Sequence, residues 1–297
     1  MRKVTKAVIP AAGLGTRFFP ATKTIPKEML PIVDKPTILY VVEEAMQAGI
    51  EDIILIAGRG KHSIEDFFDY SYEVEDKLVK EGKEHILKSL HDIRARVNII
   101  SIRQKSALGL GHAIHCAKSV IGDSPFAVLL GDEITLSDSK NNNVTHFLAE
   151  KYNETQNSSV WVLPVAPTET SKYGIVDLGP QTFAELPQGQ KVKAVIEKPP
   201  SGEAPSLWAL PGRYVFNSQI FKYLENIKPG ANGELQLSDA MNLLAKESEL
   251  KAYSFKTRRF DAGDKLGFLI ANIEVALERS DLHDDLKIYL KKLASKI

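Results

Sequence analysis

The sequence has little cysteine and no long apolar run. Cys116 is the single cysteine among 297 residues, so no disulfide can form within the chain. A chain this poor in cysteine is typical of reducing compartments, and we therefore expect a cytoplasmic protein. The apolar runs fall short of the roughly 18–20 residues that cross a bilayer, and the stretch after Met1-Arg2-Lys3 is too short for a signal peptide. We expect no contact with membranes.

An excess of either charge is also absent. The 38 basic side chains are balanced by 38 acidic ones, which leaves a formal net charge of zero. Proteins that bind nucleic acids normally carry a basic excess or a basic stripe that neutralises phosphates, so the balance argues against nucleic acid as a partner. Apolar residues make up 43% of the chain and charged residues 26%. This composition is that of a globular protein and excludes a mostly disordered chain.

Short apolar runs alternate with amphipathic stretches in the first half of the chain. This alternation predicts βαβ units, and hence an α/β fold with a mixed, mostly parallel central sheet flanked by helices. The expected strands span residues 6–9, 52–57, 97–102 and 126–130, and the expected helices span 37–48 and 111–120. The charge-rich stretch 72–92 predicts a surface helix or a pair of helices.

The pattern changes after Thr135. A polar loop is expected at 138–143, and short strands between loops that contain proline and glycine are expected at 160–165, 192–197 and 214–216. The C-terminal part returns to helices, at 237–246, 265–278 and 284–292. Since no linker interrupts the chain, we expect one domain, 1–297, in which a β-rich half, 136–297, completes the sheet of an α/β half, 1–135.

The first strand leads directly into a glycine turn, Ala11-Ala12-Gly13-Leu14-Gly15-Thr16-Arg17. Glycines let the backbone pass close to a phosphate or a base, and an arginine such as Arg17 can form a bidentate pair with phosphoryl oxygens. The turn lacks the Gly-Lys-Ser/Thr ending of a P-loop. It also lacks the third glycine of a dinucleotide fingerprint, which argues against an NAD-dependent dehydrogenase. Taken alone, the two glycines also fit an ordinary tight turn between a strand and a helix.

Two lysines lie among prolines directly after this turn. Pro20, Pro26 and Pro31 keep the segment extended and stiff, with Lys23 and Lys27 between them. A stiff backbone that carries cations can pre-organise positive charge toward a polyanion. The same residues also fit a proline-rich surface loop with solvated lysines.

The segment from Gly13 to Pro36 closely resembles the signature of the sugar-nucleotidyltransferases. Within that family it is most similar to the bacterial enzymes that act on UTP and glucose 1-phosphate. The resemblance implies a Rossmann-like nucleotidyltransferase fold, similar to the glycosyltransferase-A fold, with the nucleotide bound by the 1–135 half and the sugar by the 136–297 half. It continues in order along essentially the whole chain through Arg103-Gln104, Ala107-Leu108-Gly109-Leu110-Gly111-His112-Ala113, Ser171-Lys172-Tyr173-Gly174-Ile175-Val176, Glu197-Lys198-Pro199, Gly212-Arg213-Tyr214, Gly233-Glu234-Leu235-Gln236-Leu237 and Phe260-Asp261-Ala262-Gly263-Asp264-Lys265.

The resemblance implies that glucose 1-phosphate attacks the α-phosphorus of UTP, which gives UDP-glucose and pyrophosphate. The nucleophile is an ionised phosphate and needs no general base. Catalysis therefore depends on bringing two anions into line and on stabilising the leaving group. Such a site needs cations and a metal, here Mg²⁺, rather than a Ser/His/Asp triad. Dimers or tetramers are common among relatives of this kind, so we expect a homo-oligomer.

By the same resemblance, Arg17 and Lys27 hold the triphosphate and stabilise the departing pyrophosphate, and Lys198 clamps the sugar phosphate. Glu197 is expected to accept hydrogen bonds from sugar hydroxyls, and the Gln104 amide can match both the donor and the acceptor of the uracil edge. The expected nucleotide-binding residues are Ala11, Ala12, Gly13, Gly15, Glu28, Gln104 and Gly109, and the expected sugar-binding residues are Tyr173, Gly174, Glu197 and Lys198.

Two aspartates are the expected metal ligands. Asp132 ends an apolar strand, where side chains reach the crevice at the carboxyl edge of an α/β sheet. Asp261 is the second ligand that the resemblance implies. Mg²⁺ binds few carboxylates together with phosphate oxygens, so one or two aspartates suffice. Related sequences often carry two aspartates at the first position, where this chain has Asp132 and Glu133, so the role of Glu133 is left open.

A glucose-1-phosphate thymidylyltransferase, which uses dTTP, is the nearest alternative. Those enzymes usually read Ala-Gly-Gly in the turn and Lys-Gln-Leu in the lysine segment. This chain has Ala11-Ala12-Gly13 and Lys27-Glu28-Met29, which favours UTP. A relative that has lost catalysis is disfavoured because the chain keeps all four expected key residues, Arg17, Lys27, Asp132 and Lys198. The choice between glucose and galactose 1-phosphate is left open.

Overall fold

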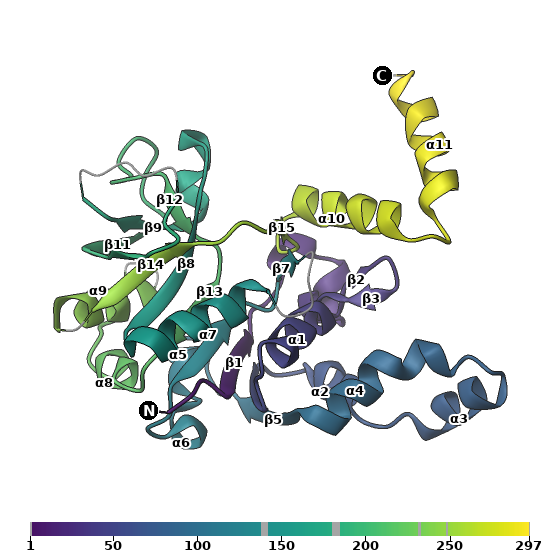
Figure 1. Ribbon diagram of the computed structural model, residues 1–297, viewed down its shortest axis with the longest axis horizontal. Helices are drawn as coiled ribbons and strands as arrows, with labels where there is room; N and C mark the ends of the chain where they lie inside the picture. Colours follow the sequence, from purple (N-terminus) through teal and green to yellow (C-terminus); the bar gives the residue numbers. More distant parts are fainter. Residues whose placement is uncertain (1, 138–141, 180–184, 231–232, 248, 297) are drawn as a thin grey trace.

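A mixed β-sheet carries strands from both halves of the chain (Figure 1). The structure, a computed structural model, describes residues 2–137, 142–179, 185–230, 233–247 and 249–296. The strand order is β11-β9-β12-β8-β13-β6-β1-β4-β5, with β14 paired to β8 and β10 paired to β14. Most of the polar loop expected at 138–143 lies outside the described residues.

The N-terminal half supplies a parallel part of the sheet. β1 (Lys6–Ala11) pairs in parallel with β4 (Asp52–Ala57) and β6 (Phe126–Leu129), and β4 pairs in parallel with β5 (Asn98–Arg103). Successive side chains of a strand point to opposite faces of a sheet. Ile9 accordingly packs in one apolar core and Val8 in the other. Burial on both faces explains why β1, β4 and β6 appear in the sequence as continuous apolar runs.

The second half extends the sheet mainly with antiparallel strands. β13 (Arg213–Phe216) pairs antiparallel with β6 and so connects the two halves. The mixed sheet that the sequence predicts is therefore confirmed. The other strands of this half are β8 (Ser158–Pro164), β9 (Gly174–Asp177), β10 (Gln190–Lys191), β11 (Ala194–Glu197), β12 (Trp208–Leu210) and β14 (Leu250–Ser254).

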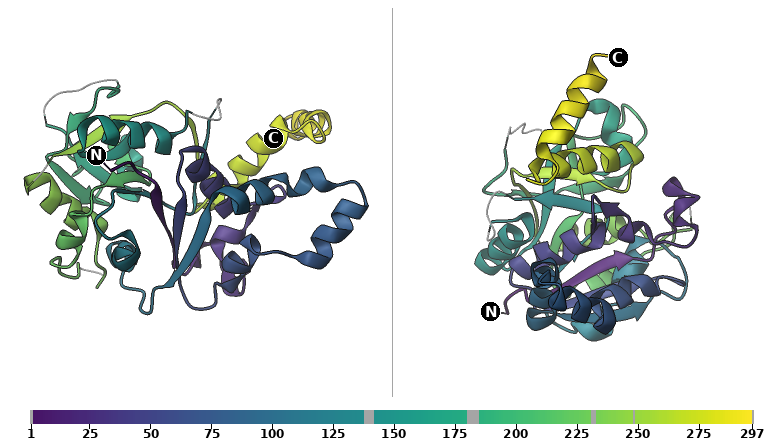
Figure 2. Two further views of the ribbon diagram at one scale, coloured as in Figure 1. Left: turned by 60° about the horizontal axis from the view of Figure 1, so that its bottom comes forward. Right: turned by 90° about the vertical axis from the view of Figure 1, so that its right-hand side faces the viewer.

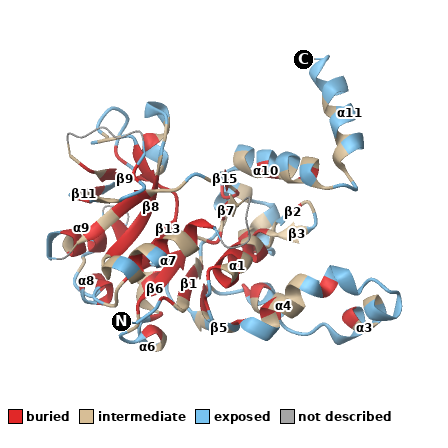
Figure 3. Cartoon of the chain, in the orientation of Figure 1, coloured by how far each residue is buried: buried red, intermediate tan, exposed pale blue. Residues whose placement is uncertain are grey.

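Helices cover both faces of the sheet, and Figure 3 shows the sheet and the helix sides facing it as buried. One core contains side chains of α1 (Thr37–Gln47), α2 (His62–Phe68), α4 (Lys88–Arg96) and α7 (Val144–Thr155). The other contains side chains of α5 (Leu110–His115), α6 (Lys118–Ile121), α8 (Ile220–Leu224) and α9 (Leu237–Glu247).

The prediction of one helix over 111–120 is wrong, because α5 and α6 are separate helices. The backbone N–H of Ala117 donates to the carbonyl of Ile114, three residues back, instead of four. This tighter turn interrupts the α-helical pattern.

Two helical segments extend away from the sheet (Figures 1 and 2). The first is α3 (Tyr72–Lys80), which extends beyond α4 and forms with it the pair expected from the charge-rich stretch. The second is α10 (Lys265–Glu278) with α11 (His283–Ala294), and α10 has the predicted bounds. Asp264 caps α10 by accepting hydrogen bonds from the backbone N–H groups of Leu266 and Gly267. Across the described residues, the helices are all too short or too polar to cross a membrane.

A small ribbon lies beside the end of β6. It consists of β7 (Glu133–Leu136) and β15 (Arg258–Asp261), which pair antiparallel with Glu133 opposite Asp261. A second short ribbon joins β2 (Pro31–Ile32) to β3 (Lys35–Pro36). The β7–β15 ribbon places residues from the middle and from the end of the sequence at the carboxyl edge of the sheet.

Candidate active site

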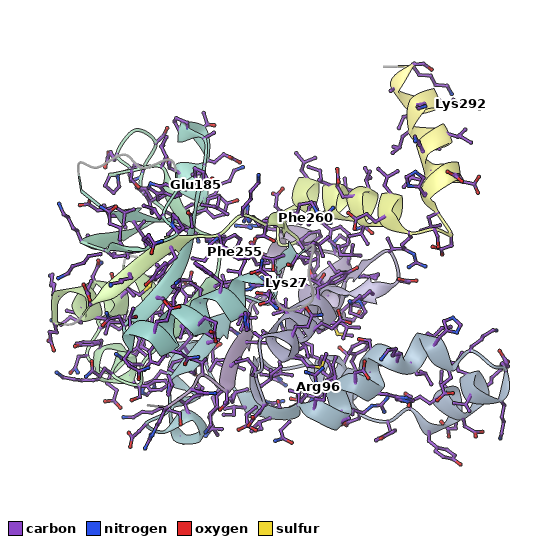
Figure 4. All side chains as sticks on the ribbon, in the orientation of Figure 1. Lys27, Arg96, Glu185, Phe255, Phe260 and Lys292 are labelled. Atoms are coloured by element: carbon purple, nitrogen blue, oxygen red, sulfur yellow. The ribbon has the colours of Figure 1, made fainter. Side chains whose placement is uncertain are left out.

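Three adjoining cavities lie along the carboxyl ends of the parallel strands. The glycine cavity, of about 480 Å³, borders the glycine turn and the end of β6. The lysine cavity, of about 540 Å³, lies between the proline-rich segment and the loop after β4. The tyrosine cavity, of about 260 Å³, borders Tyr173 on the β-rich side. Lys27 lines the first two and Asp132 lines the first and third, so the glycine cavity connects the others. Figure 4 shows Lys27 near the middle of the molecule.

Most of the predicted site residues surround these cavities. The structure thus brings together residues that the sequence separates by more than 200 positions. Arg17, which is expected at the triphosphate, lies on the side of the tyrosine cavity, and Ala11 is fully buried at the end of β1. Ala12, Gly13, Gly15, Lys27, Glu28, Gln104, Gly109 and Asp132 line the glycine cavity, and Arg17, Asp132, Tyr173, Gly174, Glu197, Lys198 and Asp261 line the tyrosine cavity.

Lys27 and Asp132 form an ion pair where two cavities meet, with Nζ 2.5 Å from Oδ2. Burial alone would lower the pKa of Lys27, but the charges of Asp132 and Glu28 outweigh it and raise this pKa. Burial would raise the pKa of Asp132, but the Lys27 charge and hydrogen bond lower it. Each group therefore keeps the other ionised. The pair holds the Lys27 ammonium group in place beside the glycine cavity, with the Asp132 carboxylate as its counter-charge.

Asp132 and Asp261 both face Gly263. A Cβ atom at residue 263 would clash with Asp132 Oδ2 and lie 3.2 Å from Asp261 Oδ1. Burial raises the pKa of Asp261, and the neighbouring Asp132 charge adds to this effect, while Arg259 opposes it. Two nearby carboxylates beside an open cavity are a suitable oxygen set for Mg²⁺, which binds few carboxylates and keeps water or phosphate ligands. Within the described residues, no cluster of three or more acidic, histidine or cysteine side chains could hold a metal.

We expect the Gly263→Ala variant to lose activity while keeping its fold. The added methyl group would displace the Asp132 carboxylate from the position in which it contacts Lys27. Displacement of a reacting site by about 1 Å can cost about 100-fold in rate, so a fall in kcat of this order is expected. Steady-state kinetics, together with thermal unfolding, would check this. A stable variant with unchanged kcat would contradict the tight placement of Asp132.

Glu28 is buried under the glycine cavity and pairs with Lys61, a residue that sequence reasoning missed. Lys61 Nζ lies 2.8 Å from Glu28 Oε2, and the two side chains are only 10% and 1% exposed. Burial raises the pKa of Glu28, and Lys61 and Lys27 oppose this rise. The run Gly58-Arg59-Gly60-Lys61 directly follows β4. Its position after a buried strand, at the carboxyl edge, is the signal that could have identified Lys61.

Gln104 is held by the loop that follows it. Its Nε2 donates to the Gly109 carbonyl at 3.2 Å and lies 2.9 Å from His112 Nδ1. The Gln104 carbonyl oxygen has no such contact among the described residues and can accept from a ligand. Gly109 has a φ of +95°, and a Cβ there would lie 2.8 Å from Glu234 Cβ. A larger residue would clash here and would be strained at this φ, so the loop requires glycine at residue 109.

Glu197 and Lys198 lie at the end of β11, in the tyrosine cavity. Lys198 has a φ of +44°, a backbone conformation that is uncommon for residues with side chains. Its backbone N–H donates to the Tyr173 carbonyl at 3.1 Å, which stabilises this conformation. Lys198 Nζ lies 3.7 Å from Glu197 Oε1. Burial raises the pKa of Glu197, and Lys198 opposes that rise. Strained backbone at a cavity wall is typical of functional sites.

Behind the cavities, Arg213 and Glu44 form a buried ion pair. Arg213 is 1% exposed, and its Nη2 lies 2.8 Å from Glu44 Oε2. The same guanidinium donates to the carbonyls of Leu130 and Glu133, at 3.3 and 2.6 Å. These two carbonyls flank Asp132, so Arg213 fixes the backbone that presents it. Sequence reasoning included Arg213 only as part of the family motif, and nothing in the sequence indicates its partner 169 positions away.

Comparison with known proteins agrees with this geometry. The family model described as "Nucleotidyl transferase" matches residues 6–276. The chain belongs to the nucleotidyl transferase family. It is 48% identical over 296 residues to the UTP–glucose-1-phosphate uridylyltransferase of Bacillus subtilis, which covers 100% of this chain and 99% of that protein.

Solved structures of nucleotidyl transferases agree with this assignment. The UTP-bound UDP-glucose pyrophosphorylase of Acinetobacter baumannii superposes with a TM-score of 0.87 at 41% identity, covering 98% of this chain and 99% of that one. A protein from Bacillus anthracis described as a glucose-1-phosphate thymidylyltransferase is more distant, with a TM-score of 0.66 at 25% identity over 90% of this chain and 93% of that one. The family resemblance and the nucleotidyltransferase fold expected from the sequence are therefore confirmed.

Proposed function

We propose that this nucleotidyl transferase transfers a uridylyl group from UTP to glucose 1-phosphate and forms UDP-glucose and pyrophosphate. The observation that carries the proposal is the full-length similarity to the B. subtilis uridylyltransferase. The site is consistent with it, because the glycine cavity lies between a cavity rich in cations and a cavity lined by Tyr173, Glu197 and Lys198. The dTTP-using alternative is represented by a more distant relative.

The proposed reaction needs no proton transfer from the protein. An oxygen of the sugar phosphate forms a bond to the α-phosphorus of UTP while the bond from that phosphorus to the bridging oxygen breaks, and pyrophosphate leaves with that oxygen. Lys198 holds the attacking phosphate in the tyrosine cavity, with Arg17 nearby. Lys27 stabilises the negative charge that grows on the leaving group. The Gln104 carbonyl oxygen faces the base.

The cavity on the other side of Lys27 suits the leaving group. Positive charge near the β- and γ-phosphates lowers the barrier to their departure. Among the residues that the structure describes, the three outer cations, Lys23, Arg59 and Lys105, have no carboxylate within 4.0 Å, so their charges are available to a ligand. The lysine cavity is lined by Lys23, Lys27, Arg59, Lys61 and Lys105.

Mg²⁺ is the proposed cofactor, with Asp132 and Asp261 as its protein ligands. The ion would neutralise phosphate charge and align the two substrates when bound. This proposal is supported by the two carboxylates that face Gly263. Because Asp132 already contacts Lys27, the protein supplies both a metal ligand and a phosphate-binding cation at one point.

Pyrophosphate release tests the proposed function. We expect release from UTP, Mg²⁺ and glucose 1-phosphate together, and none without the sugar phosphate. UTP and dTTP differ by one methyl group on the base, worth about 1–3 kcal/mol in a fitted pocket, so kcat/KM for UTP should be at least about tenfold higher. Equal kcat/KM values would contradict the UTP preference. Release of pyrophosphate with ATP, CTP or GTP but not with UTP would contradict uridylyl transfer. Galactose 1-phosphate in the same assay would define the sugar range.

We also propose that two copies of the chain associate through the C-terminal helices. α11 has no buried residue among those described. Its exposed apolar side chains, together with those of α10, form a surface that a partner could cover. We expect a homo-oligomer by light scattering and a shift toward monomer for Ile288→Glu with Leu269→Glu. A monomeric unmodified chain would contradict the proposal. The exposed side chains are Leu266, Leu269, Ile270, Ile273, Ile288, Tyr289 and Leu293.

A further inference from the structure

Arg259 joins two walls of the site and is not among the residues that line the glycine, lysine or tyrosine cavity. It lies on β15, two residues before Asp261, and its side chain is 17% exposed. Its guanidinium forms a bidentate ion pair with Glu133, in which Nε contacts Oε1 and Nη2 lies 2.9 Å from Oε2. A third nitrogen, Nη1, donates to the hydroxyl of Tyr173 at 3.0 Å. The guanidinium carbon lies 5.0 Å from the centre of the Tyr173 ring.

The two hydrogen-bonded partners of Arg259 belong to different parts of the site, and a longer ion pair joins its Nη2 to Asp261 Oδ2 at 3.8 Å. Glu133 directly follows Asp132 and begins β7, so it belongs to the ribbon that carries the carboxylate pair. Tyr173 lies at the end of a short 3₁₀ helix, Pro167–Lys172, and lines the tyrosine cavity. Its carbonyl oxygen accepts the backbone N–H of Lys198. A continuous set of contacts therefore runs from the ribbon through Arg259 and Tyr173 to the Lys198 backbone.

Arginine is the residue type that this arrangement requires. Glu133 is 4% exposed, and a buried carboxylate needs a charged partner. A planar guanidinium can satisfy both Glu133 oxygens and still direct another donor to a hydroxyl. A lysine at residue 259 could supply the charge, but its single ammonium group could not make all three contacts in that plane.

We propose that Arg259 is a positioning residue for the sugar phosphate. It holds Tyr173, and through it the Lys198 backbone, at a fixed distance from the Asp132–Asp261 pair. This inference rests on the proposed function and assigns Glu133 a structural role as the anchor of Arg259. The ion pair explains why Glu133, although next to Asp132, binds Arg259 and does not join Asp132 and Asp261 beside Gly263.

Arg259→Lys and Tyr173→Phe separate positioning from folding. Both variants keep Glu133 paired and keep the aromatic ring, but each breaks the hydrogen bond between residues 259 and 173. We expect KM for glucose 1-phosphate to rise about tenfold in each variant, the usual effect of losing a hydrogen bond to a charged group, with KM for UTP within twofold. The double variant should resemble the single variants, because both remove one contact.

The Arg94–Glu75 pair provides a matched control. It is also bidentate, with both distances 2.9 Å, but lies between α3 and α4, away from the cavities. Arg94→Lys should leave both KM values unchanged. Additive effects in the double variant, or equal rises of KM for UTP and for the sugar phosphate, would overturn the positioning role.

A binding measurement distinguishes failure of this inference from failure of the proposed function. Calorimetric titration of UDP-glucose and of UTP needs no turnover. If the unmodified chain binds both but releases no pyrophosphate, the proposed activity fails, and the ratio of the two dissociation constants still decides the inference. The dissociation constant of UDP-glucose divided by that of UTP should rise about tenfold in Arg259→Lys and in Tyr173→Phe. An unchanged ratio, or no UDP-glucose binding by the unmodified chain, would overturn it.

Discussion

Lys27→Ala is expected to reduce kcat/KM for pyrophosphate release about 100- to 1,000-fold, the usual cost of removing one charge-stabilising donor from an active site. Lys27 borders both the glycine cavity and the lysine cavity. Of the described residues that border both, it alone forms an ion pair with Asp132. Its loss removes the positive charge that we propose stabilises the departing pyrophosphate. It also leaves the Asp132 carboxylate without its closest counter-charge. Steady-state kinetics with UTP and glucose 1-phosphate varied in turn would measure the effect.

A control for this experiment is Lys88→Ala. Lys88 pairs with Asp92 on the exposed side of α4, with side chains 74% and 45% exposed, so its removal should leave kcat/KM unchanged. Circular dichroism and thermal unfolding would show whether Lys27→Ala is folded. A folded Lys27→Ala variant with the kcat/KM of the unmodified chain would remove Lys27 from the catalytic residues.

Glu44→Ala is expected to lower the free energy of unfolding by about 3–5 kcal/mol, because it leaves the buried Arg213 charge without a partner. Burial would raise the pKa of Glu44, but Arg213 and the hydroxyls of Thr135 and Thr145 lower it, so the carboxylate is ionised when the chain is folded. The hydroxyls donate to it at 2.7 and 2.6 Å. Urea unfolding at neutral pH would measure the loss.

Two comparisons separate the unpaired charge from a general packing defect. Replacing both partners, as in Glu44→Leu with Arg213→Met, should recover part of the stability, since no buried charge is then left without a partner. Recovery should be incomplete, because the Thr135 and Thr145 hydroxyls lose their acceptor. Activity should not recover, because Arg213 also holds the carbonyls on either side of Asp132. Lys88→Ala should cost at most about 0.5 kcal/mol, the usual value for an exposed pair. Arg213→Met alone, which leaves the Glu44 carboxylate unpaired, should be about as destabilising as Glu44→Ala, and a double variant that loses as much stability as the two single variants summed would contradict the role of the unpaired charge.

Local sequence pattern predicts the bounds of a strand or helix where the segment itself contains an apolar run or a capping residue. Strand 52–57 and helix 265–278 have the predicted bounds, because one is a continuous apolar run and the other begins at an aspartate cap. Most of the site residues that the resemblance implies lie around connected cavities, since a family motif contains long-range information. Periodicity alone did not detect the tight turn at Ala117, where apolar spacing continues across the break between α5 and α6.

Contacts between distant residues could not be predicted from the chain. A buried arginine or lysine is stable only beside a carboxylate. The carboxylate partners of Arg213, Lys61 and Arg259 lie at least 33 positions away in the sequence. Composition and spacing do not specify such partners. The structure is needed to show that Arg213 pairs with Glu44 behind the cavities. It also shows that Lys61 pairs with Glu28 at the wall of the lysine cavity and that Arg259 pairs with Glu133.

The β7–β15 ribbon has a consequence for the order of events during synthesis. Its two strands begin at Glu133 and Arg258, so the carboxylates of Asp132 and Asp261 come together only after about seven-eighths of the chain has been made. The parallel strands β1, β4, β5 and β6 are complete much earlier, and N-terminal units generally fold first as a chain emerges. A nascent or truncated chain that ends before Arg258 can therefore form the nucleotide-side strands and still lack the paired carboxylates. Such a chain already contains the residues of the sugar-side wall, including Tyr173 and Lys198, but we expect it to be inactive because the proposed metal-binding pair is incomplete.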